Sequence, residues 1–493
     1  MGDLLSDAFR RRILDEITPT DNEVALQKST IALLIEALKL YAEQEELQYT
    51  RIQAEGSTGK KQTQLRGASD LDIFVVLNPL HYEKVICEDA KGQSLAVDSV
   101  MDNLVESWFK PAIYSLKPSS MKKTYSQHPY LSVKYQEFDV DIVGCFELSA
   151  QELSSSGPIS AMDRTIHHSE YVALHLDHDK RNDVRMLKSF ARASHAYGDT
   201  CAVGQMGFTG YALELLIIQN NSFGEALETI IDLETTPLDP IRREITELEE
   251  IPAFKDNHVF IIDPTDPGRN VASSFDKRSY RLLKLLSSEL LAASRDGNEE
   301  QMRSLLLEKP ISSSEPPSWF MSNSLTYEFK SDGSTHYTVL RDKLYRLGRQ
   351  VVSHLQREAT GEKRFGDAIF EVYFERERFC LGFLIEQMTI AESFASRGPP
   401  INLDMAVEEF QKTHSVTYER DGYIWAIRNR PQTSAEVVVN DFIESNTIKG
   451  LERVQNSATS QRLANIIHNY VLLAEPTFPT QRIKEPLTSK SKE

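Results

Sequence analysis

The sequence predicts a multidomain α+β protein, with a mixed domain at the N-terminus, a helical central domain and α/β modules at the C-terminus. Three observations support this class. At roughly 150 residues per domain, the 493 residues of the chain correspond to about three domains. Apolar residues make up 40% of the chain and charged residues 26%, which is an ordinary globular composition and excludes wholesale disorder. The apolar periodicity also changes character at two segments rich in Ser and Pro.

The predicted N-terminal domain, residues 1–153, mixes helices with strands. Two helices are expected within residues 4–47, the second from Val24 to about Leu47 with Asp21 as its N-cap. A strand TRIQAE, a loop GSTGKKQTQLRGAS and an apolar strand DLDIFVVL follow, and Asn78-Pro79 ends the last of these. Residues 80–113 are predicted to be largely helical, and YLSVKY and FDVDIVGCFEL to be strands.

Two Ser/Pro-rich segments, SSSGPIS and KPISSSEPPS, delimit the next predicted domain, residues 154–308. Its helices are DVRMLKSFARASHAYG, GYALELLIIQ and RSYRLLKLLSSELLAAS, and VFII is a strand leading into a Pro/Gly-rich turn. Residues 319–480 mix strands such as CLGFLIEQM and DGYIWAIR with helices, which indicates an α/β body and tail. Residues 481–493 are polar and are expected to form a flexible tail.

Composition and charge narrow the class of protein. No apolar run approaches the roughly 20 residues of a membrane span, and the N-terminus has no long apolar signal region, so no membrane partner is expected. The four cysteines are scattered without zinc-ligand spacing, which predicts reduced thiols in a cytoplasmic protein. The net charge of −18 by itself argues against a nucleic-acid partner, because phosphate backbones recruit basic surfaces.

Two pairs of aspartates are the strongest chemical signal. Asp70 and Asp72 open an apolar strand and, two residues apart, share one face of it. Asp139 and Asp141 do the same in FDVDIVGCF, and only one of them is needed as a third ligand. Carboxylates held together favour a cation, and Mg²⁺ prefers oxygen ligands while leaving positions for phosphate oxygens.

The loop before the first aspartate pair is suited to a triphosphate. Gly56 and Ser57 offer backbone N–H groups and a hydroxyl, and Lys60 and Lys61 follow directly. Acidic DxD triplets at strand starts are common, so the alternative is a capped strand followed by a solvated loop. The loop at this distance from the aspartates favours nucleotide chemistry.

The order of these motifs along the chain resembles a known family. GS…T-x-LRG-x-SDLDIF with a later strand VDIV resembles the nucleotidyltransferase superfamily, which has a polymerase-beta-like palm domain. DRTIHHSEYV, VRMLKSFARASHAYG, GFTGYALELL, DPTDPGRNVA and GPPINLDMAVEEFQKTH resemble successive blocks of the class I, archaeal-type CCA tRNA nucleotidyltransferases. The resemblance covers roughly residues 20–445, in order, and is therefore far more specific than any single motif.

The resemblance implies a role for each matching residue. Asp70, Asp72 and Asp141 match the catalytic carboxylates that hold two Mg²⁺ ions, and Gly56 and Ser57 match the triphosphate loop. The loop is one residue longer than in the family, so either Lys60 or Lys61 corresponds to its basic residue. The remaining nucleotide-binding matches are Thr165, His168, Lys188, Tyr197 and Arg269, the last of which reads the Watson–Crick edge of the incoming base.

Several of these positions have a structural alternative. His168 suits a half-buried core histidine, and Arg269 could brace a Pro-rich turn. Lys188 and Tyr197 lie nine residues apart and would face opposite sides of one helix, so they converge only if Tyr197 lies beyond the helix end near Gly198. The chain also departs from the family where Ile166 replaces a common proline and where Met206 precedes the GF pair.

The implied activity is template-independent addition and repair of the 3′-terminal CCA of tRNA from CTP and ATP, by a homodimer. The alternative is a poly(A) polymerase or an oligoadenylate-synthase-like enzyme with a different acceptor. Basic clusters that could bind RNA are Lys122-Lys123, RDKLYRLGRQ at 341–350 and REATGEKR at 357–364. Within the second cluster, Arg341, Lys343, Arg346 and Arg349 are expected to share a helical face in part, and any one cluster could equally be a solvated surface.

Overall fold

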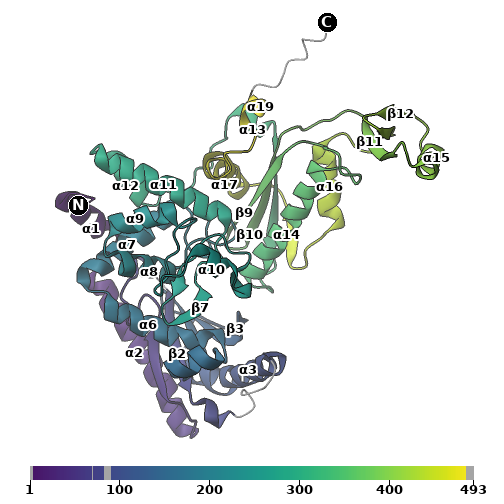
Figure 1. Ribbon diagram of the computed structural model, residues 1–493. Coiled ribbons are helices and arrows are strands. Elements are labelled where there is room, and N and C mark those ends of the chain that lie inside the picture. The colour runs from purple at the N-terminus through teal and green to yellow at the C-terminus, as the bar shows by residue number, and fades with distance from the viewer. Residues whose placement is uncertain (1–3, 69, 83–89, 485–493) are drawn as a thin grey trace. The chain divides into compact units, whose positions relative to one another are not determined.

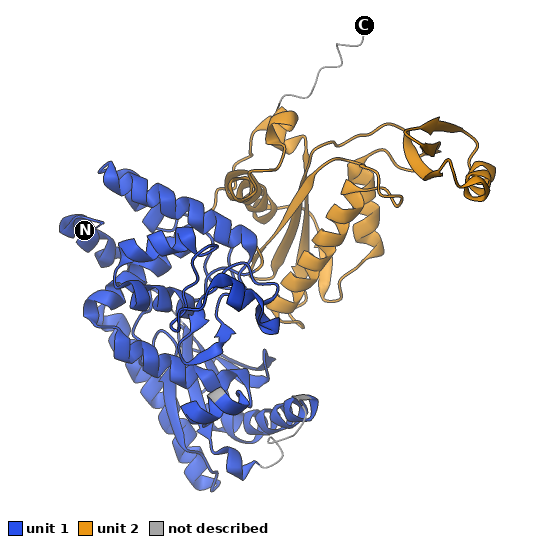
Figure 2. Ribbon diagram, in the orientation of Figure 1, with its two compact units in different colours: residues 1–201, 206–309 blue, residues 202–205, 310–493 orange. Residues whose placement is uncertain are grey.

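The chain forms two compact units. The computed structural model describes residues 4–68, 70–82 and 90–484 (Figure 1). Unit 1 contains residues 1–201 and 206–309, and unit 2 contains residues 202–205 and 310–493 (Figure 2). The boundary after residue 309 falls in the Ser/Pro-rich segment KPISSSEPPS. The predicted N-terminal and central domains thus lie together in unit 1.

Unit 1 contains one five-stranded sheet, one short hairpin and a set of helices. The helices are α1 Asp7–Ile17, α2 Asp21–Gln44, α3 Ala90–Leu104, α4 Lys110–Tyr114, α5 Ala150–Ser156, α6 Arg164–His175, α7 His178–Ala193, α8 Gly210–Asn220, α9 Phe223–Asp232, α10 Ile245–Glu249, α11 Lys277–Arg295 and α12 Glu299–Leu306. The strands are β1 Arg51–Glu55, β2 Asp70–Leu77, β3 Ser120–Tyr125, β4 Pro129–Tyr135, β5 Phe138–Phe146, β6 Ile262–Asp263 and β7 Asp266–Asn270.

The five-stranded sheet has the order β1-β2-β5-β4-β3, and its central pair, β2 and β5, is parallel while the other pairs are antiparallel. Alternation along β2 sends Leu71 and Ile73 into the main core, where they meet α2 side chains such as Leu34 and Leu38 and the buried Trp108. Phe74 and Val76 lie on the opposite face, in a smaller cluster with Ile166 of α6. Asp70 and Asp72 share the parity of this second face.

Helix α2 begins earlier than the apolar pattern predicts. Thr20, and not Asp21, is the N-cap: its side chain accepts a hydrogen bond from the backbone N–H of Glu23, and the Glu23 carboxylate accepts one from the Thr20 N–H. This reciprocal capping box satisfies two otherwise unpaired backbone donors, and a single aspartate cap would satisfy fewer. The prediction of Asp21 as N-cap was therefore wrong by one residue.

The helical part of unit 1 interlocks with the sheet part, which explains why the predicted boundary near residue 154 does not separate two units. Helix α1 packs against α7 and α12, and Arg10 of α1 forms an ion pair with Asp183 of α7. Helix α7 ends at Ala193, earlier than the predicted end near Gly198, and α8 is buried almost all round as its apolar sequence predicts. The VFII segment does not form one strand; β6 and β7 instead make a short hairpin.

Unit 2 contains two antiparallel sheets with helices. Its helices are α13 Ser318–Met321, α14 Tyr337–Gln356, α15 Asp404–Thr413, α16 Ala435–Ser445, α17 Ala458–Ile466, α18 Leu472–Ala474 and α19 Thr480–Lys484. Its strands are β8 Ser324–Ser331, β9 Ala368–Glu375, β10 Arg378–Ile385, β11 Ser393–Pro400, β12 Thr417–Arg420, β13 Tyr423–Asn429 and β14 Leu451–Val454. Strands β14-β8-β10-β9 form one sheet and β11-β13-β12 the other.

The larger sheet of unit 2 has helices on both faces. The buried side chains of α14 and α16, among them Leu344 and Val438, join one apolar core with those of β8, β9 and β10. On the other face, Gly382 of β10 lies against Leu463 of α17. Of the predicted flexible tail, residues 481–484 belong to α19, and residues 485–493 lie outside the described residues.

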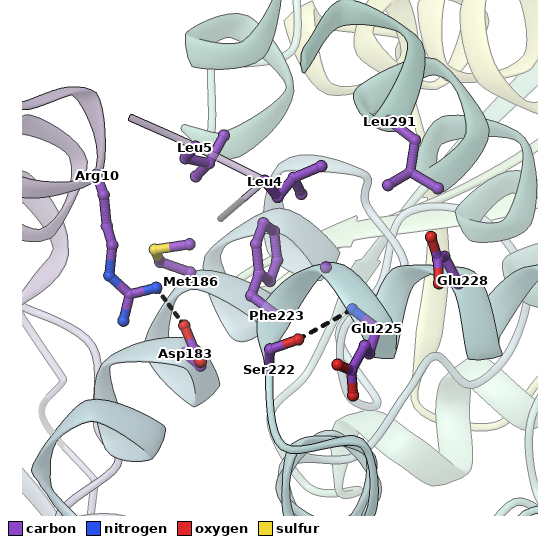
Figure 3. Close-up of a pocket in the computed structure, with 11 residues that line it drawn as sticks. Leu4, Leu5, Arg10, Asp183, Met186, Ser222, Phe223, Glu225, Glu228 and Leu291 are labelled. Carbon is purple, nitrogen blue, oxygen red and sulfur yellow. Dashed lines mark hydrogen bonds and ion pairs between the residues drawn. The ribbon is translucent and has the colours of Figure 1, made fainter. Parts of the chain in front are cut away.

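Unit 1 also encloses a cavity of about 350 Å³ beside the N-terminal segment (Figure 3). Leu4, Leu5 and Phe223 line it with apolar surface, and the Arg10–Asp183 ion pair lies at its edge. None of its lining residues belongs to the predicted nucleotide site. Among the described residues, no helix combines the length and the apolar character needed to cross a membrane.

Candidate active site

The aspartates form two cross-strand pairs at the start of the parallel strands. Asp70 is in register with Asp139, and Asp72 with Asp141. Because side chains in register on neighbouring strands point to the same face, the four carboxylates line one patch of the sheet. Asp139 forms an ion pair with Lys134 at 2.8 Å and is exposed, whereas no salt bridge of Asp70, Asp72 or Asp141 is found within the described residues. This difference favours Asp141 as the third ligand.

The carboxylates of Asp72 and Asp141, which are in register, are unfavourable in their ionised form unless a cation binds between them. Burial, followed by repulsion from Asp70, raises the pKa of Asp72 to about 6. Burial also raises the pKa of Asp141 to about 6, opposed by a hydrogen bond from Ser132 and reinforced by the charges of Asp72 and Asp70. Half-buried carboxylates without a counter-charge pay a desolvation cost that a bound divalent cation would remove.

The donor set fits Mg²⁺. All three side chains present hard oxygen donors on one face, which is the chemistry that Mg²⁺ prefers. In the part of the chain that the structure describes, however, no group of three His, Cys, Asp or Glu side chains is gathered as a ready-made metal cage. Mg²⁺ does not require one, since it usually binds one or two protein carboxylates and takes its other ligands from water and substrate phosphates.

The glycine loop reaches the carboxylates through its first residue. Gly56 has a φ of +69°, and a Cβ placed on it would lie 2.2 Å from Asp72 Oδ2. Glycine is therefore required twice, for the left-handed backbone and for the close approach to the carboxylate. Ser57 follows at the turn, half-buried, and its carbonyl accepts a hydrogen bond from the Thr63 N–H at 3.0 Å, which closes the loop.

The two loop lysines have different surroundings. Lys60 is exposed and forms an ion pair with Glu170 of α6 at 3.5 Å. Lys61 is buried, lies 3.0 Å from Glu214 of α8, and stands 5.2 Å from the centre of the Tyr211 ring. The positive charge of Lys61 also acts on Asp72, where it partly opposes the rise in pKa that burial causes. Of the two loop lysines, Lys61 is thus the one whose charge acts on Asp72.

Lys188 reaches the same buried carboxylate as Lys61. Its Nζ lies 2.8 Å from Glu214 Oε1 and donates to Thr63 Oγ1 at 2.8 Å. Burial would raise the pKa of Glu214, but the charges of Lys188 and Lys61 outweigh it and lower the pKa to about 2. Glu214 therefore stays ionised and ties the glycine loop to α7 and α8.

Tyr197 lies beyond the end of α7 and converges with Lys188, as the prediction required. A Cβ on Gly210 would lie 3.2 Å from the Tyr197 hydroxyl oxygen and 3.4 Å from Lys188 Cε, so both side chains border the same glycine. The chain turns back after Ser194, the C-cap of α7, and Tyr197 pairs in parallel with Phe208. Burial raises the pKa of Tyr197 to about 12, so it acts as a neutral hydroxyl.

His168 and Arg269 meet at a second buried carboxylate, Asp263. His168 Nε2 lies 2.7 Å from Asp263 Oδ2, and Arg269 Nη1 lies 2.9 Å from the same oxygen. The His168 ring stacks on Tyr211 with a centroid distance of 4.1 Å. Burial lowers the pKa of His168, which keeps its imidazole neutral near pH 7. Thr165 lies half-buried on α6, one turn before His168.

The structure also contains site residues that the sequence reasoning missed: Glu214, Asp263, Tyr211 and Thr63. One signal was available, because Glu214 is the lone charge within the otherwise apolar helix GYALELLIIQ. An unexplained charge in a buried helix requires a partner, and here it has two lysines. Asp263 ends an apolar run in the same way. Tyr211 and Thr63 carried no signal that spacing alone could reveal.

Comparison with known proteins agrees with this arrangement. Residues 182–297 match the family model "tRNA nucleotidyltransferase, second domain". The chain is similar to the CCA-adding enzyme of Sulfurisphaera tokodaii, with 26% identity over 87% of this chain and 90% of that one. It is also similar to the CCA-adding enzyme of Pyrobaculum neutrophilum, with 29% identity over 72% of this chain and 73% of that one.

Two solved structures are similar over part of the chain. E. coli MS115-1 CdnC with ATP gives a TM-score of 0.44 at 16% identity and covers 62% of this chain and 96% of that one. A mutant of the Cid1 poly(U) polymerase bound to MgATP gives a TM-score of 0.45 at 14% identity and covers 61% of this chain and 98% of that one.

A mixed sheet whose parallel strands start with facing carboxylates, next to a glycine loop and two buried lysines, defines a nucleotidyltransferase. Similarity to CCA-adding enzymes along most of the chain then specifies the branch of this superfamily. The chain belongs to the archaeal-type CCA-adding enzymes.

Proposed function

We propose that this protein adds and repairs the 3′-terminal CCA of tRNA, using CTP and ATP without a nucleic-acid template. The observation that carries the proposal is the register of Asp72 with Asp141 beside the Gly56 approach, in a chain of this family. In this reaction the 3′-hydroxyl of the tRNA attacks the α-phosphate of the nucleotide, and pyrophosphate leaves. Negative charge develops on the phosphoryl oxygens, so the site must supply positive charge and fixed donors.

Asp70, Asp72 and Asp141 are the residues that would hold two Mg²⁺ ions, because their oxygens face one patch and need a counter-charge. When bound there, Mg²⁺ would lower the pKa of the attacking hydroxyl and neutralise charge on the transferred phosphate. The chain's own contribution is rigidity: β2 and β5 are paired in register over eight residues, from Asp70 and Asp139 to Leu77 and Phe146. Strands of this kind hold side chains more accurately than loops do.

We assign triphosphate binding to the glycine loop together with Lys61 and Lys188. Lys61 is favoured over Lys60 because its charge acts on Asp72 and it shares Glu214 with Lys188, whereas Lys60 is exposed beside Glu170. The two lysines place positive charge where the leaving pyrophosphate would be.

We assign the nucleoside to Thr165, His168, Tyr197 and Arg269. Arg269 is suited to reading a base edge, because its side chain is 37% exposed and only its Nη1 has a hydrogen-bond partner among the described residues. A guanidinium with free N–H donors can pair with two acceptors at once, which a lysine cannot.

For tRNA we propose one face of α14 in unit 2. On α14, Lys343, Arg346, Gln350 and Ser353 recur at helical spacing. These residues and Arg357, which follows the helix, are exposed and line two adjoining hollows that share Gln350. No ion pair of Lys343 or Arg346 is found in the part of the chain that the structure describes. Cations of this kind suit a phosphate backbone that is read by shape.

The other predicted basic residues are less suited to RNA. Arg341 does not join the α14 face, because it is buried and pairs with Asp342. Arg364 is buried beside Glu358, at 3.7 Å. Lys123 forms ion pairs with two carboxylates, those of Asp102 and Glu106. Basic residues that are close in the sequence thus do not all lie on one exposed surface.

The direct test is primer extension on a tRNA that ends at its discriminator base. CTP alone should add two residues, ATP alone none, and the two together the full CCA. Extension of the same tRNA by ATP alone into an A tail would refute the proposal in favour of a poly(A)-polymerase activity. Asp141→Asn should lower CMP incorporation by at least about 10³-fold while binding tRNA normally, and near-normal incorporation would remove Asp141 from the site.

The homodimer and the cytoplasmic location stay predictions. The described cysteines, Cys145, Cys201 and Cys380, are free and buried, which agrees with a reducing compartment, and Cys87 lies outside the described residues. Light scattering of the purified protein would settle the first prediction.

A further inference from the structure

Asp263, at the end of β6, is a buried carboxylate with a complete set of hydrogen bonds. Its side chain has no exposed surface. Oδ1 accepts hydrogen bonds from the Tyr211 hydroxyl at 2.9 Å, the Thr265 N–H at 2.9 Å and the Thr265 hydroxyl at 2.8 Å. Oδ2 lies 2.7 Å from His168 Nε2 and 2.9 Å from Arg269 Nη1. Full burial places Asp263 behind these partners, out of reach of solvent.

The partners of Asp263 come from three elements. His168 lies on α6, Tyr211 on α8, and Thr265 and Arg269 on the β6–β7 hairpin. The imidazole of His168 stacks on the Tyr211 ring at an interplanar angle of 22°, so the two rings cannot turn independently. One carboxylate thereby fixes the relative positions of a helix, a second helix and a hairpin.

Arg269 is held by one of its nitrogens only. Nη1 lies 2.9 Å from Asp263 Oδ2 and 3.2 Å from His168 Nε2, while no partner of Nε or Nη2 is found among the residues described. Two contacts at one nitrogen restrict the rotation of the guanidinium and leave its other N–H groups to meet a ligand. A carboxylate at this place is a strong anchor, because its hydrogen bond to the guanidinium is between two ionised groups.

We propose that Asp263 is a positioning residue for nucleotide selection, which sets the plane of the Arg269 guanidinium and the orientation of His168 toward the incoming base. The inference rests on the proposed function, in which Arg269 meets the base edge. Cytosine and uracil differ in their hydrogen-bonding edge, and so do adenine and guanine. A guanidinium free to rotate would still attract a nucleotide but would no longer distinguish these edges.

The charge of Asp263 is maintained across the working range. Burial works to raise its pKa, but the hydrogen bonds from His168 and Thr265 outweigh it and hold the pKa well below the ordinary value. Asp263→Asn is nearly isosteric, removes the negative charge and turns one acceptor into an N–H donor that faces Arg269 or His168. It therefore perturbs the anchor without opening a cavity.

The test compares nucleotide selection with catalysis. For Asp263→Asn, the ratio of kcat/KM for CTP to that for UTP on a tRNA lacking CCA should fall about 10-fold, and KM for CTP should rise. The kcat at saturating CTP should stay within about threefold of the parent, because the carboxylates and lysines at the phosphates are untouched. An unchanged selectivity ratio and KM would overturn the proposal.

Asp239→Asn is the matched control. Asp239 is another buried carboxylate of the same unit, paired with Arg243, which in turn donates a hydrogen bond to the Pro267 carbonyl of β7. Its loss should lower the melting temperature but leave the CTP-to-UTP ratio unchanged. If Asp239→Asn lost selectivity equally, looseness of the hairpin would explain both variants, and the assignment to Asp263 would be wrong.

A double-mutant cycle separates this inference from the proposed function. If Asp263 acts through Arg269, adding Asp263→Asn to Arg269→Ala should change selectivity by less than about twofold. A full 10-fold further loss would overturn the inference. If Arg269→Ala alone kept full selectivity, the base-reading part of the proposed function would fail, while CCA addition itself is tested separately by primer extension.

A second variant covers the case in which Asp263→Asn does not fold. Tyr211→Phe keeps the ring that stacks on His168 and removes only the hydroxyl that donates to Asp263. It should reduce the CTP-to-UTP ratio about threefold with kcat retained. Selectivity equal to that of the parent would count against the network.

Discussion

Replacing Gly56 by alanine tests how closely the glycine loop and the catalytic carboxylates are coupled. The φ of +69° costs an L-residue about 1–2 kcal/mol. The new Cβ would lie 2.2 Å from Asp72 Oδ2, whereas nonbonded heavy atoms prefer roughly 3.5–4 Å. The Asp72 carboxylate must then move by about 1 Å or more. A displacement of that size can lower a rate by about 10²-fold.

The measurements are kcat for CMP incorporation and the melting temperature. We expect kcat to fall at least about 10²-fold, with a loss of a few degrees in melting temperature, at about 2–4 °C per kcal/mol for a large domain. The matched control is Gly297→Ala, in which the glycine also has a positive φ, +65°, but no atom lies within 4 Å of a Cβ. The control carries the backbone strain alone, so it should lose stability and keep activity.

The comparison of Gly56→Ala with Gly297→Ala shows whether the clash with Asp72 lowers kcat. If Gly56→Ala were within about threefold of Gly297→Ala in kcat, the position of Asp72 would tolerate the clash. The coupling between loop and carboxylate argued from the structure would then be refuted.

Three further predictions concern charge. Asp72→Asn in metal-free protein should be more stable than the parent by at most about 3 kcal/mol at pH 7.5 and keep only about half of that advantage at pH 5, since the folded pKa of about 6 exceeds the ordinary value of 3.8 and ionisation between these pH values destabilises the parent. Thermal unfolding at both pH values checks this. Lys61→Ala should raise KM for CTP about 10-fold and Lys60→Ala by less than about threefold, measured by steady-state incorporation. The double variant Lys343→Glu with Arg346→Glu should weaken tRNA binding at least about 10-fold at low salt and reduce the slope of log K against log salt by about two.

Each of these three predictions would be contradicted by a different result. If the difference in stability between Asp72→Asn and the parent did not change with pH, ionisation of Asp72 would not destabilise the folded protein. If Lys61→Ala and Lys60→Ala changed KM for CTP equally, the assignment of the triphosphate to Lys61 rather than Lys60 would be wrong. For the α14 variant the control is Lys28→Glu on the exposed face of α2, and an equal loss of tRNA affinity there would indicate a general charge effect.

Much of the site was predictable because its residues are close in sequence or share a strand. Asp70 and Asp72 lie on one face by the period of two, and the apolar run DLDIFVVL defines the strand itself. Periodicity did not choose between Asp139 and Asp141, since both share a face of β5, and only the family resemblance pointed to Asp141. The structure adds that Lys134, across the strand pair, forms an ion pair with Asp139.

Local chemistry explains the errors in element boundaries. The apolar stripe of α2 starts at Val24, but hydrogen bonding between Thr20 and Glu23 begins the helix earlier. The domain boundary near residue 154 stays a prediction, and within unit 1 the ion pair of Lys61 with Glu214 links the segments on its two sides. Composition marks where a chain is polar, and only side-chain contacts decide which segments pack as one.

The sequence by itself determined the elements and the chemistry: the DLDIFVVL strand, the glycine loop, the carboxylates and the family they resemble, because periodicity and motif spacing are local properties of the chain. The tertiary structure decided which charges meet. It joined Lys61 and Lys188 at Glu214, brought Tyr197 next to Lys188, and gave Asp263 its partners from three elements. Buried charges must find partners, and those partners come from segments far apart in the sequence, which no local pattern encodes.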